Sequence, residues 1–240
     1  MLKFLGRGSA FNVKEGNTSA YYITNTDYGN TLILLDCGES VFKEIVSRNI
    51  LENIKFVNVF ISHLNSDHIG SLSSLLFYLK YKSKINLIDI VCGYGIKDDI
   101  ITLLNIQGNN LDDYNIYESS ENDEDININI DEGCFRLIKV NHIKGMNCYG
   151  VVTKLNNNLI YYSGDSNEIP IEIMDNIEKI DYLYQDTCLA DYEGNVHLSL
   201  IKLCELIPTE HRHKVWCMHL DCDELIEKAK SEGFNVVENI

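Results

Sequence analysis

Four side chains that can bind a metal ion occur within six residues of this chain. In the stretch Val57 to Leu72, VNVFISHLNSDHIGSL, an apolar run ends abruptly in His63, Asn65, Asp67 and His68. Imidazole nitrogen suits zinc, iron or manganese, while a carboxylate oxygen can also bridge two ions or hold a water. Because imidazole and carboxylate groups at this spacing serve no purpose in packing, we predict a metal site here.

The residues around this cluster predict the elements that position it. The run from Lys55 to Ser62 is strand-like, and it cannot keep alternating once it meets the polar residues. We therefore expect a strand, a short loop and then a helix that starts near His68, with its body from Ile69 to Tyr81. This arrangement directs several ligand atoms into one small volume at the carboxyl end of a strand.

A short apolar run followed by a His or an Asp recurs along the chain. The residues in this position are His63, His142, Asp165, Asp186 and His219. The carboxyl ends of strands in a layered α/β protein lie along one edge, where binding sites collect. The sequence therefore predicts one site that is assembled from distant strand ends.

The predicted elements are mostly strands, with helices between them. We expect strands at 2–5, 20–24, 31–35, 57–62, 85–91, 135–140, 149–155, 159–163, 180–185 and 215–218, and further helices at 41–49, 97–104, 197–206 and 223–231. The acidic stretch from Asp112 to Glu132 predicts a solvated surface excursion with two weak strands in its ININ repeat. Since no internal repeat and no clear linker occur, we expect a single domain over residues 1–240.

Composition limits the partners of the protein. The 20 basic and 36 acidic residues give a net charge of -16, which repels phosphate backbones and anionic membrane surfaces. We therefore expect no membrane and no long nucleic acid as a partner. The eight cysteines are scattered singly, which predicts free thiols in a reducing compartment. There is no signal-peptide core, and no apolar stretch approaches the ~20 residues of a membrane helix, so we expect a cytoplasmic protein.

With these residues in place, the sequence resembles the metallo-β-lactamase superfamily. The superfamily signature H-x-H-x-D-H stands here as HLNSDH at 63–68, and the later ligand positions match His142, Asp165 in SGD, and His219. GRGSAF, LLDCGE and SDHIGSL are most similar to the ribonuclease Z-like branch. The resemblance implies an α/β fold in four layers, the αββα sandwich. It also implies one or two divalent metal ions, with zinc expected first and manganese or iron as alternatives.

The resemblance also implies which residues bind each ion. One ion would be held by His63, His142 and Asp165, and the other by Asp67, His68, Asp165 and His219. Asp165 would bridge the two ions. A water between two cations loses its proton near neutral pH and becomes the nucleophile, which Asp67 could also orient.

A second resemblance to the same branch concerns proton donation. YQDTC, followed by VHLSL, resembles an acidic residue and a histidine that act there as a pair. By this implication Asp186 orients His197, and His197 protonates a leaving oxygen.

Two departures from the family pattern stand out. Asn65 replaces the second His of the signature, and an amide oxygen is a harder and weaker ligand than imidazole. The first ion position could therefore be empty, weak, or occupied by manganese, magnesium or iron. In addition, only the 22 residues from 143 to 164 separate His142 from Asp165, which leaves no room for the tRNA-gripping arm of ribonuclease Z.

These observations favour a metal-dependent hydrolase, and specifically a phosphodiesterase that acts on a small nucleotide or a short oligonucleotide. The pair of Asp186 and His197 is the feature that lactam or thioester hydrolysis would not require. One alternative is a ribonuclease Z-type endoribonuclease, which would show salt-sensitive RNA binding. The other is a non-catalytic ligand-binding module with a degraded metal site, which Asn65 favours and the six retained positions disfavour. The resemblance is also compatible with a homodimer.

Overall fold

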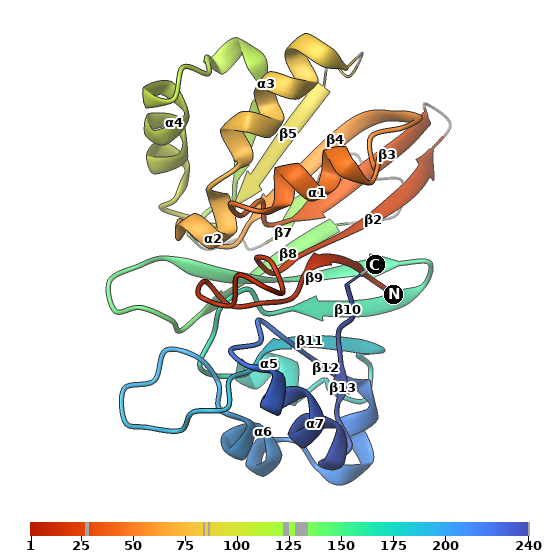
Figure 1. Cartoon of the computed structure of the whole chain (residues 1–240), viewed down its shortest axis with the longest axis vertical. Helices are drawn as coiled ribbons and strands as arrows, with labels where there is room; N and C mark the ends of the chain where they lie inside the picture. Colours follow the sequence, from red (N-terminus) through yellow and green to blue (C-terminus); the bar gives the residue numbers. More distant parts are fainter. Residues whose placement is uncertain (27–28, 84, 86, 122–124, 128–133, 240) are drawn as a thin grey trace.

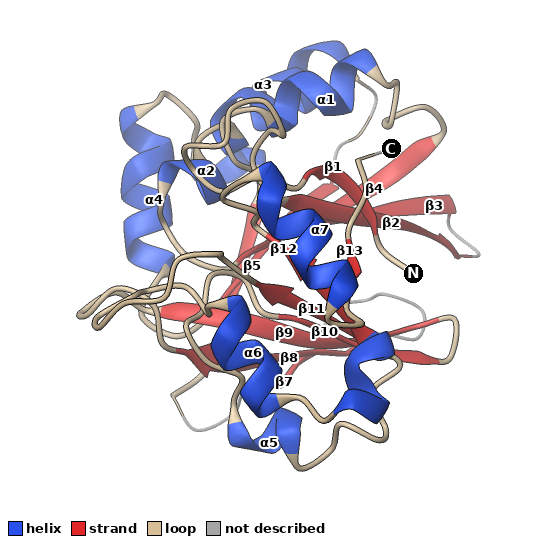
Figure 2. Cartoon of the chain, turned by 60° about the horizontal axis from the view of Figure 1, so that its bottom comes forward, coloured by secondary structure: helices blue, strands red, loops and turns tan. Residues whose placement is uncertain are grey.

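Two β-sheets lie face to face, with helices on their outer surfaces (Figure 1). The computed structural model describes residues 1–26, 29–83, 85, 87–121, 125–127 and 134–239. Helices α1, α3 and α4 cover one sheet, and α5, α6 and α7 cover the other (Figure 2). The predicted four-layer αββα architecture is therefore confirmed.

The first sheet contains the strands from the amino-terminal half of the chain. Its order is β1 (Lys3–Gly6), β2 (Ser19–Thr26), β3 (Gly29–Leu35), β4 (Ile54–Ile61), β5 (Leu87–Cys92) and β6 (Asn115–Glu118). From β3 to β6 the strands are parallel. The helices between them are α1 (Val41–Ser47), α2 (Ser66–Ile69), α3 (Leu72–Lys82) and α4 (Lys97–Ile106). Because this sheet is covered on both faces, β3 ends in four consecutive apolar residues that are fully buried.

The second sheet contains the strands from the carboxyl-terminal half. Its order is β13 (Asn235–Val236), β12 (Val215–Met218), β11 (Tyr182–Asp186), β10 (Asn158–Tyr162), β9 (Cys148–Leu155), β8 (Cys134–Val140) and β7 (Asp125–Asn127). The strands from β7 to β10 are antiparallel, and those from β10 to β13 are parallel. The covering helices are α5 (Ile171–Met174), α6 (Leu200–Leu206) and α7 (Asp223–Ser231), with a short 3-10 turn, η2 (Thr209–Lys214), before β12. A second 3-10 turn, η1 (Leu111–Asp113), precedes β6 of the first sheet.

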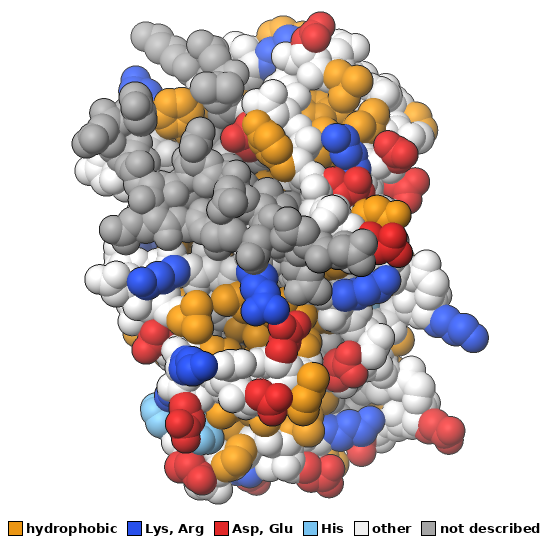
Figure 3. Space-filling view, turned by 180° about the vertical axis from the view of Figure 1, so that it is seen from behind, with side chains coloured by type: hydrophobic (Ala, Val, Ile, Leu, Met, Phe, Trp, Pro, Cys, Tyr) orange, Lys and Arg blue, Asp and Glu red, His pale blue; other side chains and the backbone are white. Residues whose placement is uncertain are grey.

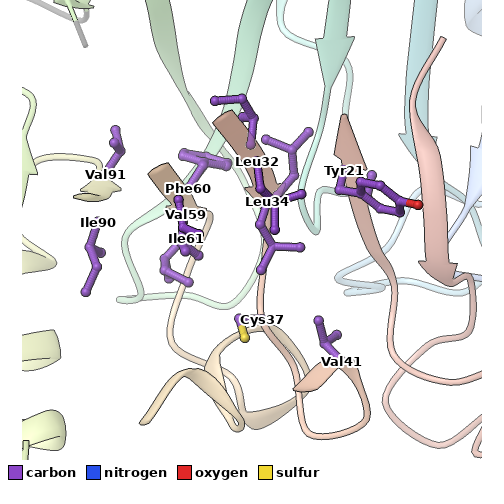
Figure 4. Close-up of a cluster of buried hydrophobic side chains, with 14 of the residues drawn as sticks. Tyr21, Leu32, Leu34, Cys37, Val41, Val59, Phe60, Ile61, Ile90 and Val91 are labelled. Carbon is purple, nitrogen blue, oxygen red and sulfur yellow. The ribbon is translucent and has the colours of Figure 1, made fainter. Parts of the chain in front are cut away.

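The main core lies between the two sheets and beneath the helices of the first. Phe60 of β4 and Phe135 of β8 face one another across the sheets, with ring centroids 6.4 Å apart. Figure 4 shows Leu32 and Leu34 of β3 beside Phe60 in this core. Burial of each such side chain stabilises the fold by roughly 1.5–3 kcal/mol, so the core holds the strand ends in place.

The predicted helix after the metal-ligand cluster is interrupted. It begins at Ser66 rather than near His68, and it breaks at residues 70–71 before α3 starts. In a continuous helix the His68 carbonyl would accept from the amide of Leu72. Here it accepts from the amide of Cys37 at 2.7 Å, and the Cys37 carbonyl accepts from the amide of Ser71 at 3.0 Å. Docking against the loop after β3 thus competes with the helix and breaks it.

The helix predicted for residues 197–206 begins later, at Leu200. Ser199 is its N-cap, and the Ser199 hydroxyl accepts a hydrogen bond from the amide of Lys202. His197 therefore lies in the preceding loop. Of the two weak strands predicted in the Ile-Asn repeat, β7 forms, and residues 128–130 lie outside the described residues.

The described surface mixes charges of both signs. Figure 3 shows lysine and arginine side chains interspersed with acidic ones on the face behind the view of Figure 1. Seven cysteine side chains that the structure describes are free thiols. Among the described residues, no helix is both long enough and apolar enough to cross a bilayer.

Candidate metal centre

Strand ends from both sheets meet at one edge of the sandwich. The candidate residues at these ends are Asp36 after β3, His63 after β4, His142 after β8, Asp165 after β10, Asp186 at the end of β11 and His219 after β12. The parallel pairs β3–β4 and β10–β11–β12 put their carboxyl ends on the same side. Strand β8 runs in the same direction as β10 because both are antiparallel to β9.

The backbone has a positive φ angle at three of these strand ends. Gly164 has φ +59°, and a Cβ there would lie 2.8 Å from the Cβ of Ser62, so only glycine lets the end of β10 approach the end of β4. Asp36 and His219 also have positive φ, at 64° and 57°. Such conformations cost on the order of 1–3 kcal/mol in non-glycine residues, and functional sites are among the places where they cluster.

The loop and helix that follow β4 contribute two more buried side chains, Asp67 and His68 of α2. Asn65 is the N-cap of this helix and is half-buried. Its carbonyl accepts from the amide of His68 at 2.9 Å, and its side chain makes no capping hydrogen bond. The structure thus places Asn65 at the start of α2, and its part in metal binding stays a prediction.

Asp165 divides the histidines into two groups. Its Oδ1 atom lies 3.0 Å from Nε2 of His68 and 3.4 Å from Nε2 of His219. Its Oδ2 atom lies 3.8 Å from Nε2 of His63 and 3.7 Å from Nε2 of His142. We call the first set, together with Asp67, the His68 group, and the second set the His63 group; both include Asp165.

The distances within each group suit a bound cation. In the His68 group, Oδ2 of Asp67 lies 3.4 Å from Nε2 of His68 and 3.3 Å from Nε2 of His219. The ligand atoms of each group all lie within 4.8 Å of one another. With zinc–nitrogen bonds of about 2.0–2.1 Å, neighbouring ligand atoms of a tetrahedral site are ~3.4 Å apart. Each group therefore has room for one ion.

Asp36 holds two of the imidazoles in one orientation. Nδ1–H of His68 donates to Oδ2 of Asp36 at 2.9 Å. The hydroxyl of Ser62 also donates to this oxygen at 2.9 Å, so it is available to accept from Nδ1–H of His63 at 3.0 Å. Tyr162 donates to the same oxygen at 3.0 Å. Sequence reasoning assigned no role to Asp36, although it follows an apolar strand as Asp165 does.

Several buried ligand atoms lack a hydrogen-bond partner, and this provides a test of whether a cation fits. Nδ1–H of His142 donates to the carbonyl of Val196 at 3.0 Å, which leaves Nε2 for the cluster. Nε2 atoms of three histidines and one carboxylate oxygen are buried and have no hydrogen-bond partner among the described residues: those of His63, His68 and His142, and Oδ1 of Asp165. Buried polar atoms of this kind require a partner, and a divalent cation in each group would provide one to all four.

The pKa values of His219 and His68 are shifted in the opposite direction from that of His63. Burial lowers the pKa of His219, but Asp165 and Asp186 outweigh burial and raise it to about 10. Burial likewise opposes charge on His68, and Asp165 and Asp36 raise its pKa well above the usual value. For His63, burial and the neighbouring His68 lower the pKa well below the usual value.

The carboxylates stay ionised despite their burial. Burial raises the pKa of Asp165, but His219 and His68 outweigh it and hold the pKa well below the usual value. The pKa of Asp67 is lowered in the same way, against burial, by hydrogen bonds from His219 and His68. The His68 group is therefore a buried anionic site in which protons or a cation must balance the charge.

Asp186 and His197 form a pair beside the cluster. Nδ1–H of His197 donates to Oδ2 of Asp186 at 2.7 Å. Burial lowers the pKa of His197, but Asp186 outweighs burial and raises it. The His197 side chain is 25% exposed, whereas that of His219 is 2% exposed, although their ring centroids are 4.9 Å apart. Oδ1 of Asp186 lies 3.3 Å from Nδ1 of His219, so one carboxylate contacts both histidines.

Two face-to-face sheets with His and Asp groups at their strand ends define the metallo-β-lactamase fold. Two solved structures of this class superpose on the chain. The metallo-β-lactamase fold protein YhfI from Bacillus subtilis has a TM-score of 0.75 and 17% identity, over 100% of this chain and 95% of that one. Human tRNase Z, short form, has a TM-score of 0.68 and 16% identity, over 99% of this chain and 95% of that one. At these identities the likeness shows the fold alone, and the predicted fold class is confirmed.

The sequence comparisons identify the family. The family model of Anti-Pycsar protein Apyc1 matches residues 1–239, so the chain belongs to the Anti-Pycsar protein Apyc1 family. Anti-Pycsar protein Apyc1 of Bacillus phage BSP38 is 26% identical over 235 residues, which cover 91% of this chain and 88% of that protein. The chain is thus a member of a metallo-β-lactamase-fold hydrolase family.

The predicted similarity to ribonuclease Z is also confirmed. Ribonuclease Z of Lactococcus lactis subsp. lactis (strain IL1403) is 34% identical over 112 residues, which cover 46% of this chain and 36% of that enzyme. Ribonuclease Z of Oceanobacillus iheyensis is 32% identical over 133 residues, which cover 50% of this chain and 42% of that enzyme. The matched segments therefore span less than half of the length of these relatives.

Proposed function

We propose that this protein is a metal-dependent phosphodiesterase that acts on a small nucleotide or a short oligonucleotide. The observation that carries the proposal is the pair of Asp186 and His197, 2.7 Å apart, next to the groups that share Asp165. His197 is partly exposed while Asp186 is fully buried. Such a histidine can give a proton to the leaving oxygen of a phosphodiester, with its ring oriented by the carboxylate.

The residues of the two groups would hold one or two divalent ions. The His63 group and the His68 group would each take one, with Asp165 shared; zinc suits these ligands, and manganese or iron are alternatives. When bound, such ions lower the pKa of a water and offset charge on phosphodiester oxygens. Asp67 would orient the attacking water, and His197 would hold the proton for the leaving oxygen.

Two features support a small substrate. The net charge of -16 repels a long polyanion, so recognition must be confined to the site itself. Between His142 and Asp165, a fully described segment, the chain forms only β9 and β10 with short connections. This segment therefore has no arm that could grip a folded RNA.

The proposal is tested by hydrolysis of bis-p-nitrophenyl phosphate with added manganese or zinc. We expect hydrolysis by the wild type and its loss in Asp67→Ala, with Asp112→Ala, at an exposed position, as the matched control. Equal, background-level rates in the wild type and Asp67→Ala would exclude a phosphodiesterase. Cyclic nucleotides and short RNAs should then be screened as substrates.

A ribonuclease Z-type endoribonuclease is the second candidate, because ribonuclease Z relatives are 32–34% identical over parts of the chain. It predicts cleavage of a structured precursor RNA, with binding that weakens steeply as salt increases. A ligand-binding module would instead bind a nucleotide without cleaving it under any metal condition.

A further inference from the structure

The loop that carries His197 is closed at its base and turns one polar side chain inward. This His197 loop consists of residues 188–199, and the amide of Cys188 donates to the carbonyl of Leu198 at 3.0 Å. Residues 191–194 at its tip are exposed. Asn195 follows the tip directly and is only 5% exposed.

Both polar atoms of the Asn195 side chain form hydrogen bonds within the loop. Its Nδ2 donates to the carbonyl of Ala190 at 2.9 Å and to the sulfur of Cys188 at 3.2 Å. Its Oδ1 accepts from the amide of His197 at 3.1 Å. The Asn195 carbonyl accepts from Nδ2 of Asn167, on the β10 side of the site, at 3.0 Å. Asn195 thus connects Cys188 and Ala190, at the start of the loop, to the backbone of His197 near its end.

The two residues after Asn195 contact two different parts of the site. The carbonyl of Val196 accepts from Nδ1–H of His142 and so presents Nε2 of His142 to the His63 group. The next residue, His197, bonds to Asp186. A shift of this short backbone segment would therefore misplace both histidines together.

We propose that Asn195 is a positioning residue that sets His142 and His197 at the same time. The part that concerns His197 rests on the proposed phosphodiesterase function. The part that concerns His142 rests on metal binding and can be measured without any substrate. Asn195 itself takes no part in bond making or breaking.

The test compares Asn195→Ala with Glu193→Ala, a change at an exposed position of the same loop. The first readout is zinc affinity, measured by competition with a chromophoric chelator. We expect the zinc affinity of the His63 group to fall about tenfold in Asn195→Ala and to be unchanged in Glu193→Ala, in line with the ~10–100-fold effects of residues that orient ligands.

The second readout is the dependence of hydrolysis on the leaving group. Phenyl and p-nitrophenyl esters of thymidine 5′-phosphate differ in their need for a proton on the leaving oxygen. Because proton donation contributes roughly 10²–10⁴-fold, we expect kcat of Asn195→Ala to fall about tenfold for the phenyl ester and far less for the p-nitrophenyl ester. A residue with a merely structural role would lower both rates equally.

A third variant, Asn167→Ala, keeps Asn195 and removes the hydrogen bond to its carbonyl. We expect smaller losses of zinc affinity and of kcat for the phenyl ester. This variant replaces Asn195→Ala if Asn195→Ala does not fold. Wild-type zinc affinity and wild-type leaving-group dependence in a folded Asn195→Ala would overturn the inference. If the wild-type protein hydrolyses neither ester, the proposed function fails, and zinc affinity alone decides the role of Asn195: a loss supports it, and no change overturns it.

Discussion

The His68 group and the His63 group share Asp165 but differ in the number of carboxylates that they contain. The His68 group adds a second carboxylate, Asp67, and its donor atoms lie 3.0–3.4 Å apart across the measured pairs. The His63 group has no second carboxylate, and its imidazoles lie 3.7–3.8 Å from Asp165. A divalent cation gains more from two carboxylates than from one, so we expect the His68 group to bind its ion more tightly.

The supports behind the imidazoles differ in the same sense. In the His68 group, His68 donates to Asp36 and His219 lies beside Asp186, both of which are carboxylates. In the His63 group the corresponding supports are neutral, namely the Ser62 hydroxyl and the Val196 carbonyl. A carboxylate behind an imidazole makes it a more basic ligand than a neutral partner does. From this difference we expect one strong and one weak metal position around the single shared carboxylate.

The largest effect is expected from Asp165→Ala, because both groups lose their shared ligand. Metal content should fall to near zero per chain, measured by elemental analysis, and phosphodiester hydrolysis should fall on the order of 10³-fold. An Asp165→Ala protein that kept one tightly bound ion would show that the groups do not depend on a common carboxylate.

The comparison itself is tested by removing one ligand from each group. Asp67→Ala should abolish the tighter of two binding steps in a zinc titration, and His142→Ala should abolish the weaker one. Each loss should exceed the ~10–100-fold effect typical of a supporting residue. Identical titrations for the two variants would contradict the assignment of a strong and a weak position.

A smaller effect is expected from the supports. Asp36→Asn should weaken both positions by about 10–100-fold, because Asp36 contacts His68 directly and His63 through Ser62. Ser62→Ala should weaken mainly the His63 group. Circular dichroism of each variant separates a loss of affinity from a loss of folding, and equal effects of Asp36→Asn and Ser62→Ala on the tighter position would refute this division.

The variant Asn65→His tests the comparison by adding a ligand instead of removing one. An added imidazole near the His63 group should tighten its zinc binding by about tenfold and bring the two positions closer in affinity. The measurement is zinc bound per chain at limiting metal. No increase over the wild type would mean that residue 65 does not reach this position.

The smallest effect concerns pH and stability. In the metal-free protein the pKa of His219 is raised from 6.5 to about 10. Its stabilising contribution is therefore fully present below pH 6.5 and is lost as the pH rises toward 10. Zinc replaces the protons, so the difference in Tm between zinc-loaded and metal-free protein should grow by a few degrees from pH 6.5 to 9.5. His213→Ala, at an exposed position, is the control, and a difference that shrinks with pH would contradict the prediction.

Much of the site could be predicted because its signals are local. His63, Asp67 and His68 lie within six residues, and a strand followed by His or Asp recurs at His142 and His219. Which segments form strands and helices follows from hydrophobic patterns, which are also local. The order of the layers was implied by the family resemblance. Short elements such as α5 and β13 were missed because four or two residues show no periodicity.

The sequence by itself determined which chemical groups this protein can bring to one edge and, through its family resemblance, the αββα layers that bring them there. Only the tertiary structure decided that Asp36 supports His68, that Val196 orients His142 and that the two oxygens of Asp165 serve different groups. The residues in these contacts are far apart in the sequence: 32 positions for Asp36 and His68, 54 for His142 and Val196, and 102 for His63 and Asp165. The physical reason is that hydrogen bonds have strict distances and directions, which packed elements set and local patterns do not encode.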